Sequence, residues 1–306
     1  MKDLGLYIHI PFCKQKCAYC DFYSKTGSVG EQQRYVAAIG GEIKAAQRRH
    51  EFKTVYIGGG TPSVLYSGAV TELGINTSKV KEFTIEANPE SLSAEKVEEY
   101  KKAGATRISL GVQSLNDEAL KAAGRLHTAQ QALSAMALAP NLSVDIILGL
   151  PHDNLRTLEH TLNTLIAERP GHISAYMLEG KMQADEDLQA DMYELCREKL
   201  TAAGYGHYEI SNFALPGKES AHNMLYWTGG KYVGIGDSAV SFLGERTDRE
   251  LIIFGLRTAK GVPVELLQKF PAQLERISKY LEFNGQYASI KRQYWILSNS
   301  ILVEFI

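Results

Sequence analysis

Long apolar runs and a surplus of basic residues are both missing from this sequence. No stretch of about 18 apolar residues occurs, which is roughly the length that a bilayer-spanning helix needs. The first residues, MKDLGLYIHIPF, lack the basic segment and long apolar stretch of a signal peptide. The formal net charge is −2, so no basic excess indicates nucleic acid as a partner. These absences predict a cytoplasmic protein with no membrane span and no nucleic-acid partner.

Cysteine is scarce, and its placement is informative. The chain has four cysteines, and Cys13, Cys17 and Cys20 form a single C-x3-C-x2-C run. A secreted disulfide framework would instead distribute paired cysteines along a short chain. The run therefore indicates metal ligation in a reducing compartment. Cys196, alone in MYELCREKL, is predicted to be a small buried helix residue.

Short β-rich segments alternate with helical patterns over the N-terminal two thirds of the chain. The strand candidates are mostly apolar runs, which is typical of parallel strands covered on both faces. Helices are predicted at 31–47, from Ser93 to Gly104, and at 155–168. The six predicted strands are 6–10, 54–57, 82–87, 107–112, 143–148 and 172–178. Six βα units predict an α/β fold, a partial (β/α)6 barrel of the TIM type, with its chemistry at the carboxyl ends of the strands.

The βα alternation stops after about residue 205, where Gly, Asn, Tyr and Trp become frequent. Residues from about 216 onward have the pattern of a smaller α+β unit. The sequence therefore predicts two domains, a core domain at 1–215 and a C-terminal domain at 216–306.

The cysteine run follows directly after the first predicted strand. A four-iron cluster needs one ligand on each iron beyond its sulfides, so three cysteines leave one iron open for a small bidentate ligand. A zinc site is the alternative. Structural zinc takes four protein ligands and catalytic zinc takes three with a water, and an x3-x2 spacing on one loop is unusual for either.

A glycine-rich turn, GGGTP at 58–62, follows the second predicted strand. Exposed amides of such a turn can accept an anion, and glycine lets the backbone approach a ligand closely. Taken alone, the segment is equally consistent with a tight turn.

Together, the cysteine run and the glycine turn resemble the radical SAM superfamily. The resemblance implies a [4Fe–4S] cluster on Cys13, Cys17 and Cys20, with the amino and carboxylate groups of S-adenosylmethionine on the open iron. It also implies that the reduced cluster cleaves this cofactor to a 5′-deoxyadenosyl radical.

Further motifs are similar to those of the HemN/HemW group, which contains the oxygen-independent coproporphyrinogen III oxidases and their relatives. They are YIHIPFC at 7–13, IEANP at 85–89, RISLGVQSLN at 107–116, GRLH at 124–127, DIILGLP at 145–151, YEISNF at 208–213, HNMLYW at 222–227, GIG at 234–236 and GLR at 255–257. The resemblance implies S-adenosylmethionine contacts at Tyr7, Tyr19, Gly59, Gly60, Thr61, Glu86, Gln113, Arg125 and Asp145. Gln113 and Asp145 could instead satisfy backbone groups at the barrel mouth.

Two features favour the HemW branch of haem chaperones over the oxidases. The oxidases continue the cluster loop to a fourth cysteine, where this chain has Phe22. They also carry an extension before the Tyr7 motif, whereas only six residues precede this motif in the sequence here. Imidazole is a common axial haem ligand, and the resemblance implies this role for His222, beside the flat rings of Tyr226 and Trp227.

The resulting hypothesis is a chaperone that binds haem as cargo and delivers it to an acceptor protein, plausibly a respiratory enzyme. A reductant such as a flavodoxin or ferredoxin is expected as a second partner. Oxidative decarboxylation of coproporphyrinogen III is the enzymatic alternative, and another radical SAM reaction is a third possibility.

Overall fold

The structure is a computed structural model, and it describes residues 3–139, 141–182 and 184–306. Across these ranges the strands form a nine-stranded sheet in the order β7-β8-β6-β5-β4-β3-β2-β1-β9. Strands β1 to β6 and β9 run parallel, and β7 and β8 pair antiparallel at the β6 edge. The bounds are β1 Leu4–Ile10, β2 Thr54–Gly59, β3 Glu82–Ala87, β4 Arg107–Gln113, β5 Leu142–Leu148, β6 His172–Met177, β7 Gly206–Glu209, β8 Asn212–Ala214 and β9 Lys231–Ile235.

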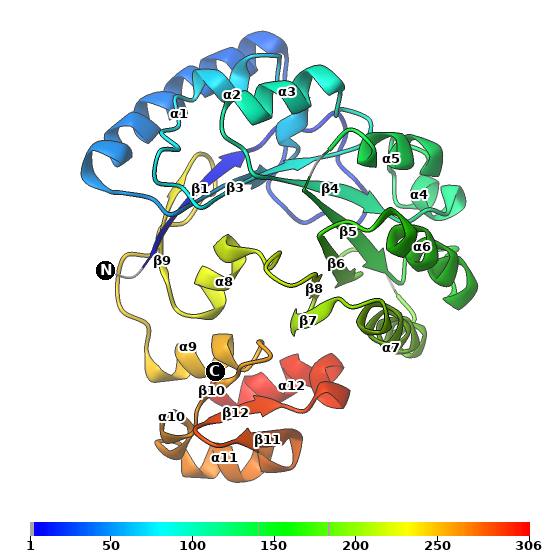
Figure 1. Cartoon of the computed structure of the whole chain (residues 1–306), viewed down its shortest axis with the longest axis vertical. Helices are drawn as coiled ribbons and strands as arrows, with labels where there is room; N and C mark the ends of the chain where they lie inside the picture. Colours follow the sequence, from blue (N-terminus) through cyan, green and yellow to red (C-terminus); the bar gives the residue numbers. More distant parts are fainter. Residues whose placement is uncertain (1–2, 140, 183) are drawn as a thin grey trace.

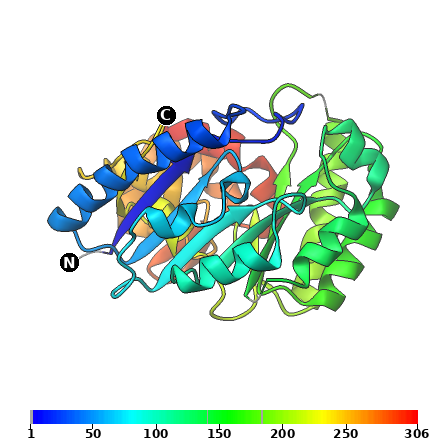
Figure 2. The same ribbon diagram turned by 90° about the horizontal axis from the view of Figure 1, so that it is seen from above.

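Helices cover the convex side of the curved sheet, which gives a partial α/β barrel (Figures 1 and 2). The predicted six strands and three helices are confirmed, with shifts of a few residues at the ends. Cys196 is buried within α7, as predicted. The covering helices are α1 Val29–Arg49, α2 Ala69–Glu72, α3 Ala94–Lys102, α4 Asp117–Ala122, α5 Ala129–Met136, α6 Leu155–Glu168 and α7 Glu186–Ala202. Among the helices described, none has the length and apolarity to span a bilayer.

The strands are parallel and buried on both faces, as expected, but the two faces differ in polarity. In β3, Phe83 and Ile85 are fully buried in the core. Glu82, Thr84 and Glu86 alternate with them and point to the concave side. Successive side chains of a strand face opposite ways, so the apolar set packs under the helices. The polar set lines the interior of the barrel.

Helix α8, Ala221–Trp227, lies inside the curve of the sheet rather than on its outer side (Figure 1). Its first turn is held by Glu82, at the start of β3. The carboxylate accepts hydrogen bonds from the backbone N–H groups of Ala221 and His222, both at 2.9 Å. Arg107, at the start of β4, ion-pairs with Glu82 at 3.3 Å and donates to two carbonyls just before α8. We call this contact set the Glu82 latch.

Replacement of Glu82 by Gln should lower the free energy of unfolding by about 3 kcal/mol, because it leaves the largely buried Arg107 guanidinium without its carboxylate. Urea denaturation of both proteins measures the difference. The control is Glu98→Gln, which removes an exposed pair with Lys101 and should change the midpoint little. Equal urea midpoints for wild type and Glu82→Gln would contradict the stabilising role of the Glu82 latch.

The chain after residue 215 contributes to both parts of the molecule. Strand β9 pairs with β1, so the large sheet extends beyond the predicted core domain. The remaining elements surround a three-stranded sheet in the order β10-β12-β11. These elements are α9 Asp248–Gly255, β10 Val262–Pro263, α10 Val264–Gln268, α11 Pro271–Ile277, β11 Leu281–Asn284, β12 Tyr287–Ile290 and α12 Ser298–Leu302. The domain boundary at 215/216 stays a prediction. Strand β9 and helix α8 follow this boundary in the sequence, but both pack against strands of the predicted core domain.

Candidate functional site

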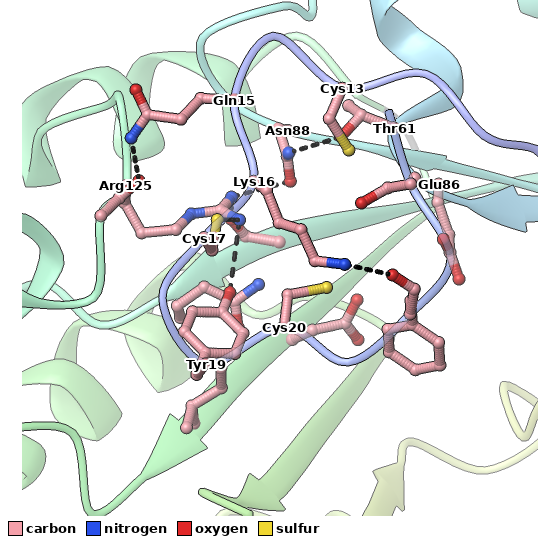
Figure 3. A pocket seen from close by; sticks show the side chains of 18 of the residues that line it. Cys13, Gln15, Lys16, Cys17, Tyr19, Cys20, Thr61, Glu86, Asn88 and Arg125 are labelled. Atoms are coloured by element: carbon pink, nitrogen blue, oxygen red, sulfur yellow. Dashed lines mark hydrogen bonds between the residues drawn. The ribbon is translucent and has the colours of Figure 1, made fainter. Parts of the chain in front are cut away.

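A cavity of about 430 Å³ opens at the carboxyl ends of β1 to β6. Strand ends and the loops that follow β1, β2, β3, β4 and β6 supply its walls, and β5 contributes Asp145 and Ile147, as expected when parallel strands end at one edge. Figure 3 shows the side chains that converge there. Eleven of the predicted site residues line this cavity: Cys13, Cys17, Tyr19, Cys20, Gly59, Gly60, Thr61, Glu86, Gln113, Arg125 and Asp145. Tyr7 and His222 do not belong to its lining.

The loop that carries the three cysteines is pinned at both ends by backbone hydrogen bonds. Cys13 N–H donates to the Lys25 carbonyl at 2.9 Å, and Lys25 N–H donates to the Pro11 carbonyl at 2.7 Å. In its middle, Ala18 N–H donates to the carbonyl of Ala123 at 3.2 Å. All three cysteines are free and half-buried. The sequence therefore folds the thiols into a preformed arrangement at the mouth of the cavity.

Burial raises the pKa of the Cys13 and Cys20 thiols, and the neighbouring thiols raise it further. Ligation by a metal cluster would remove these protons. Within the described ranges, no three His, Cys, Asp or Glu side chains converge on a point where one metal ion would bind. A cuboidal cluster attaches each cysteine to a different iron, so its thiolates surround a volume instead. The three thiols line one cavity, and a four-iron cluster with one open iron takes three thiolates.

Arg125 is a buried cation beside this loop. Its guanidinium donates to the Cys17 sulfur at 3.7 Å and to the Tyr19 hydroxyl at 3.4 Å, while its other arm binds Asn88 Oδ1 at 2.7 Å. Its Nε has no hydrogen-bond partner among the described residues. A guanidinium here would offset the negative charge of a thiolate-ligated cluster.

The glycine turn serves close packing. The amides of Gly59, Gly60 and Thr61 donate to Glu86 Oε2, the Ile10 carbonyl and the Phe12 carbonyl, respectively. The three amides are therefore already paired within the protein, one of them with a carboxyl group, and anion binding by this turn stays a prediction. Gly59 has a φ of +113°, and a Cβ on Gly60 would lie 2.8 Å from the Phe12 carbonyl oxygen and 3.0 Å from the Cys13 sulfur. Glycine therefore lets the turn lie directly against the cysteine loop.

Two carboxyl groups stand deeper in the cavity. Glu86 accepts hydrogen bonds from the Tyr56 hydroxyl at 2.7 Å and from Gly59 N–H at 3.2 Å. Burial, with a smaller contribution from Asp145, raises the pKa of Glu86 to about 7. Asp145 accepts a hydrogen bond from the Ser109 hydroxyl at 3.0 Å, and burial raises its pKa as well. A ligand with a cationic amine or hydroxyl groups would match these acceptors.

Asn88 and His9 entered the sequence prediction only as members of the IEANP and YIHIPFC motifs, and Tyr56 was not singled out. Asn88 links Arg125 to Thr61, since its Nδ2 donates to Thr61 Oγ1 at 3.0 Å. Tyr56 holds Glu86, and the ring of His9 fills the space in front of Gly59 and hydrogen-bonds to the Tyr7 hydroxyl at 3.1 Å. The alternation along β2 is the one signal for Tyr56, because it stands two residues before Gly58 on the inward face.

His222 lies in the first turn of α8, near the amino end of β2, and is fully buried. Its Nδ1 shares a hydrogen bond with the Thr54 hydroxyl at 2.8 Å, and its Nε2 shares one with the Tyr226 hydroxyl at 2.9 Å. Burial lowers the pKa of the imidazole to about 3, so the ring is neutral. Neutral imidazole is the form that binds iron, but neither nitrogen is free in this arrangement. The structure gives no support to His222 as a haem ligand while α8 is latched.

The raised pKa of Glu86 predicts a pH dependence of stability. The unfolded carboxyl titrates near 4.5 and the folded one near 7, so the folded state binds the proton more tightly. The stability that this proton contributes is complete below about pH 4.5 and is lost as the pH rises through about 7. The wild type should therefore lose on the order of 2 kcal/mol relative to Glu86→Gln over this range.

Urea denaturation of the cofactor-free proteins at several values between pH 4.5 and 8 tests this. Glu209, whose pKa burial also raises to about 7, is present in both proteins and cancels in the comparison. Parallel pH profiles would mean that Glu86 is not protonated near neutrality.

Comparison with known proteins identifies the family to which this chain belongs. The model of the family described as "Radical SAM superfamily" matches residues 7–165. "Heme chaperone HemW" of Escherichia coli is 39% identical over 265 residues, covering 78% of this chain and 70% of the relative. The Bacillus subtilis protein of the same name is 36% identical over 267 residues, with the same coverage.

Among solved structures, coproporphyrinogen III oxidase (HemN) from Escherichia coli, described as a radical SAM enzyme, superposes with a TM-score of 0.82. The superposition covers 99% of this chain and 90% of that chain at 18% sequence identity. This likeness confirms the predicted fold, a partial radical SAM barrel with a smaller α+β unit.

Proposed function

Because the chain belongs to the radical SAM superfamily and to its HemW-type members, we propose that it is a haem chaperone that carries a SAM-ligated [4Fe–4S] cluster. The sequence identity of up to 39% to relatives named as haem chaperones carries this proposal. The arrangement of the cavity supports its cofactor part. The proposal includes a cytoplasmic location, where a reducing environment would preserve the cluster.

The cluster would be held by Cys13, Cys17 and Cys20, and Arg125 would balance its charge. When bound, the cluster supplies single electrons and S-adenosylmethionine supplies the sulfonium that such electrons cleave. The protein's own share is positioning. Gly60 brings the second strand's turn against Cys13, and Glu86 presents a carboxylate to the amine or ribose hydroxyls of the ligand. Tyr19 would close one side of the cavity near Arg125.

For the cargo, we propose that His222 ligates haem after α8 leaves the Glu82 latch. The neutral ring and the flat side chains of Tyr226 and Trp227 on the same helix support this assignment. Opening would break the hydrogen bond between Nδ1 and Thr54 on β2, whereas the bond between Nε2 and Tyr226 lies within α8 and would move with the helix. The haem would then be passed to an acceptor protein.

The second candidate function is oxidation of coproporphyrinogen III, favoured by the fold shared with HemN. Anaerobic incubation of the reconstituted protein with coproporphyrinogen III, S-adenosylmethionine and dithionite separates the two candidates. The chaperone proposal expects no protoporphyrinogen, with a coproporphyrinogen oxidase run in parallel as the positive control. Formation of protoporphyrinogen at a catalytic rate would contradict the chaperone proposal and support oxidation of coproporphyrinogen III.

A further inference from the structure

Lysines are concentrated on the outer side of the cysteine loop. Residues 13–25 contain Lys14, Lys16 and Lys25 but a single acidic residue, Asp21, although the whole chain has a net charge of −2. The three lysines are exposed. Asp21 is within 3.5 Å of Lys181, so its charge is already shared with a fourth lysine. Lys25 is paired with Asp237 at 3.6 Å, so we call Lys14, Lys16 and the nearby Phe22 the lysine face.

The charges of Lys14 and Lys16 are not neutralised locally. The Lys14 amine donates to the Glu90 carbonyl at 2.7 Å, and the Lys16 amine donates to the Phe22 carbonyl at 3.2 Å. Backbone carbonyls fix the two side chains without cancelling their charge. Among the described residues, no carboxylate is paired with either amine. Figure 3 shows the Lys16 side chain between Cys13, Cys17 and Cys20.

An apolar contact point stands within this positive surface. The Phe22 side chain is 71% exposed, although it directly follows the cysteine loop. Its carbonyl is the acceptor for Lys16, so the ring and the charge are held together. Weak complexes between electron-transfer proteins are small and depend on charge to orient the partners, and one exposed aromatic ring among charges suits such a contact.

We propose that the lysine face is the docking surface for an acidic one-electron carrier protein. This inference rests on the proposed function, because it needs a cluster on the three cysteines. The loop that carries the cysteines also carries the exposed Lys14 and Lys16, so a protein docked on these lysines would lie close to the cluster. The reduced carrier gives up one electron and the cluster gains it, with no bond made or broken.

The test is the rate of cluster reduction by a photoreduced acidic bacterial flavodoxin, followed anaerobically by stopped-flow absorbance at low ionic strength. The variant is Lys14→Glu with Lys16→Glu. The matched control is Lys260→Glu with Lys279→Glu, which makes the same charge change on exposed lysines of the C-terminal unit. The loop variant should be reduced at least about tenfold more slowly than wild type, while the control keeps the wild-type rate.

Two further readouts separate docking from damage to the site. Dithionite, a small reductant, should reduce all three proteins at the same rate, and added salt should slow flavodoxin only in the wild type and the control. Lys14→Gln with Lys16→Gln should give an intermediate rate if the reversal variant folds poorly. If flavodoxin reduces the cluster at the same rate in the cluster-loaded loop variant and in the wild type, the proposed docking surface is wrong, while the proposed function is unaffected. Absence of iron and sulfide from the wild type would overturn the proposed function, and this inference with it.

Discussion

Replacement of any one of Cys13, Cys17 and Cys20 by alanine should abolish the cluster and, with it, high-affinity binding of S-adenosylmethionine. Each thiol lines the same cavity, and each would ligate a different iron. No other cysteine can substitute, because Cys196 is buried within α7. Anaerobic reconstitution followed by iron and sulfide analysis measures the effect, with about four of each expected per wild-type chain.

Cys196→Ala is the matched control, since it removes a thiol of the same chain away from the cavity. It should keep a full iron and sulfide content. The ligand assignment would fail if a variant at Cys13, Cys17 or Cys20 retained the broad visible absorbance and iron content of the wild type. Circular dichroism of each variant establishes that the barrel still folds, because the loop is outside the hydrophobic core.

Haem binding is expected to depend on His222 and to be limited by the Glu82 latch. His222→Ala should remove saturable binding, since it deletes the proposed axial ligand. Tyr226→Phe keeps the imidazole but removes the hydrogen bond to Nε2, so it should bind haem at least as well as the wild type. Glu82→Gln should bind haem faster, because α8 leaves the concave side more readily.

Soret absorbance after mixing with haemin measures both the extent and the rate of binding. Thr54→Val is a useful companion, because it removes the other hydrogen bond of the ring and leaves His222 in place. If His222→Ala binds haem as the wild type does, the cargo site lies elsewhere. If Glu82→Gln folds and binds at the wild-type rate, opening of α8 is not the limiting step.

Much of the cavity could be predicted from the sequence, because its residues follow strands. Cys13 comes after β1, Gly59 ends β2, and Glu86 is near the end of β3. Since parallel strands end at one edge, a correct order of strands already gathers these side chains. The sequence therefore predicted which residues share the cavity wherever their positions depend only on the order of the strands.

The other end of the barrel could not be predicted in this way. The bonds of His222 to Thr54 and Tyr226, and of α8 to Glu82, join segments that are far apart in the sequence. Nothing in the HNMLYW segment indicates that its first turn is capped by a carboxylate from β3. The same limit applies to the glycine turn, whose amides looked free in the sequence but bind Glu86 and two carbonyls of the β1 end.

The central claim is that this cluster-bearing chain binds haem as cargo, and an anaerobic haemin titration of the reconstituted wild type tests it most directly. The account predicts a Soret band that saturates at about one haem per chain, in a sample whose iron and sulfide content shows a full cluster. A Soret signal that rises without saturation, as expected for nonspecific adsorption, would contradict it.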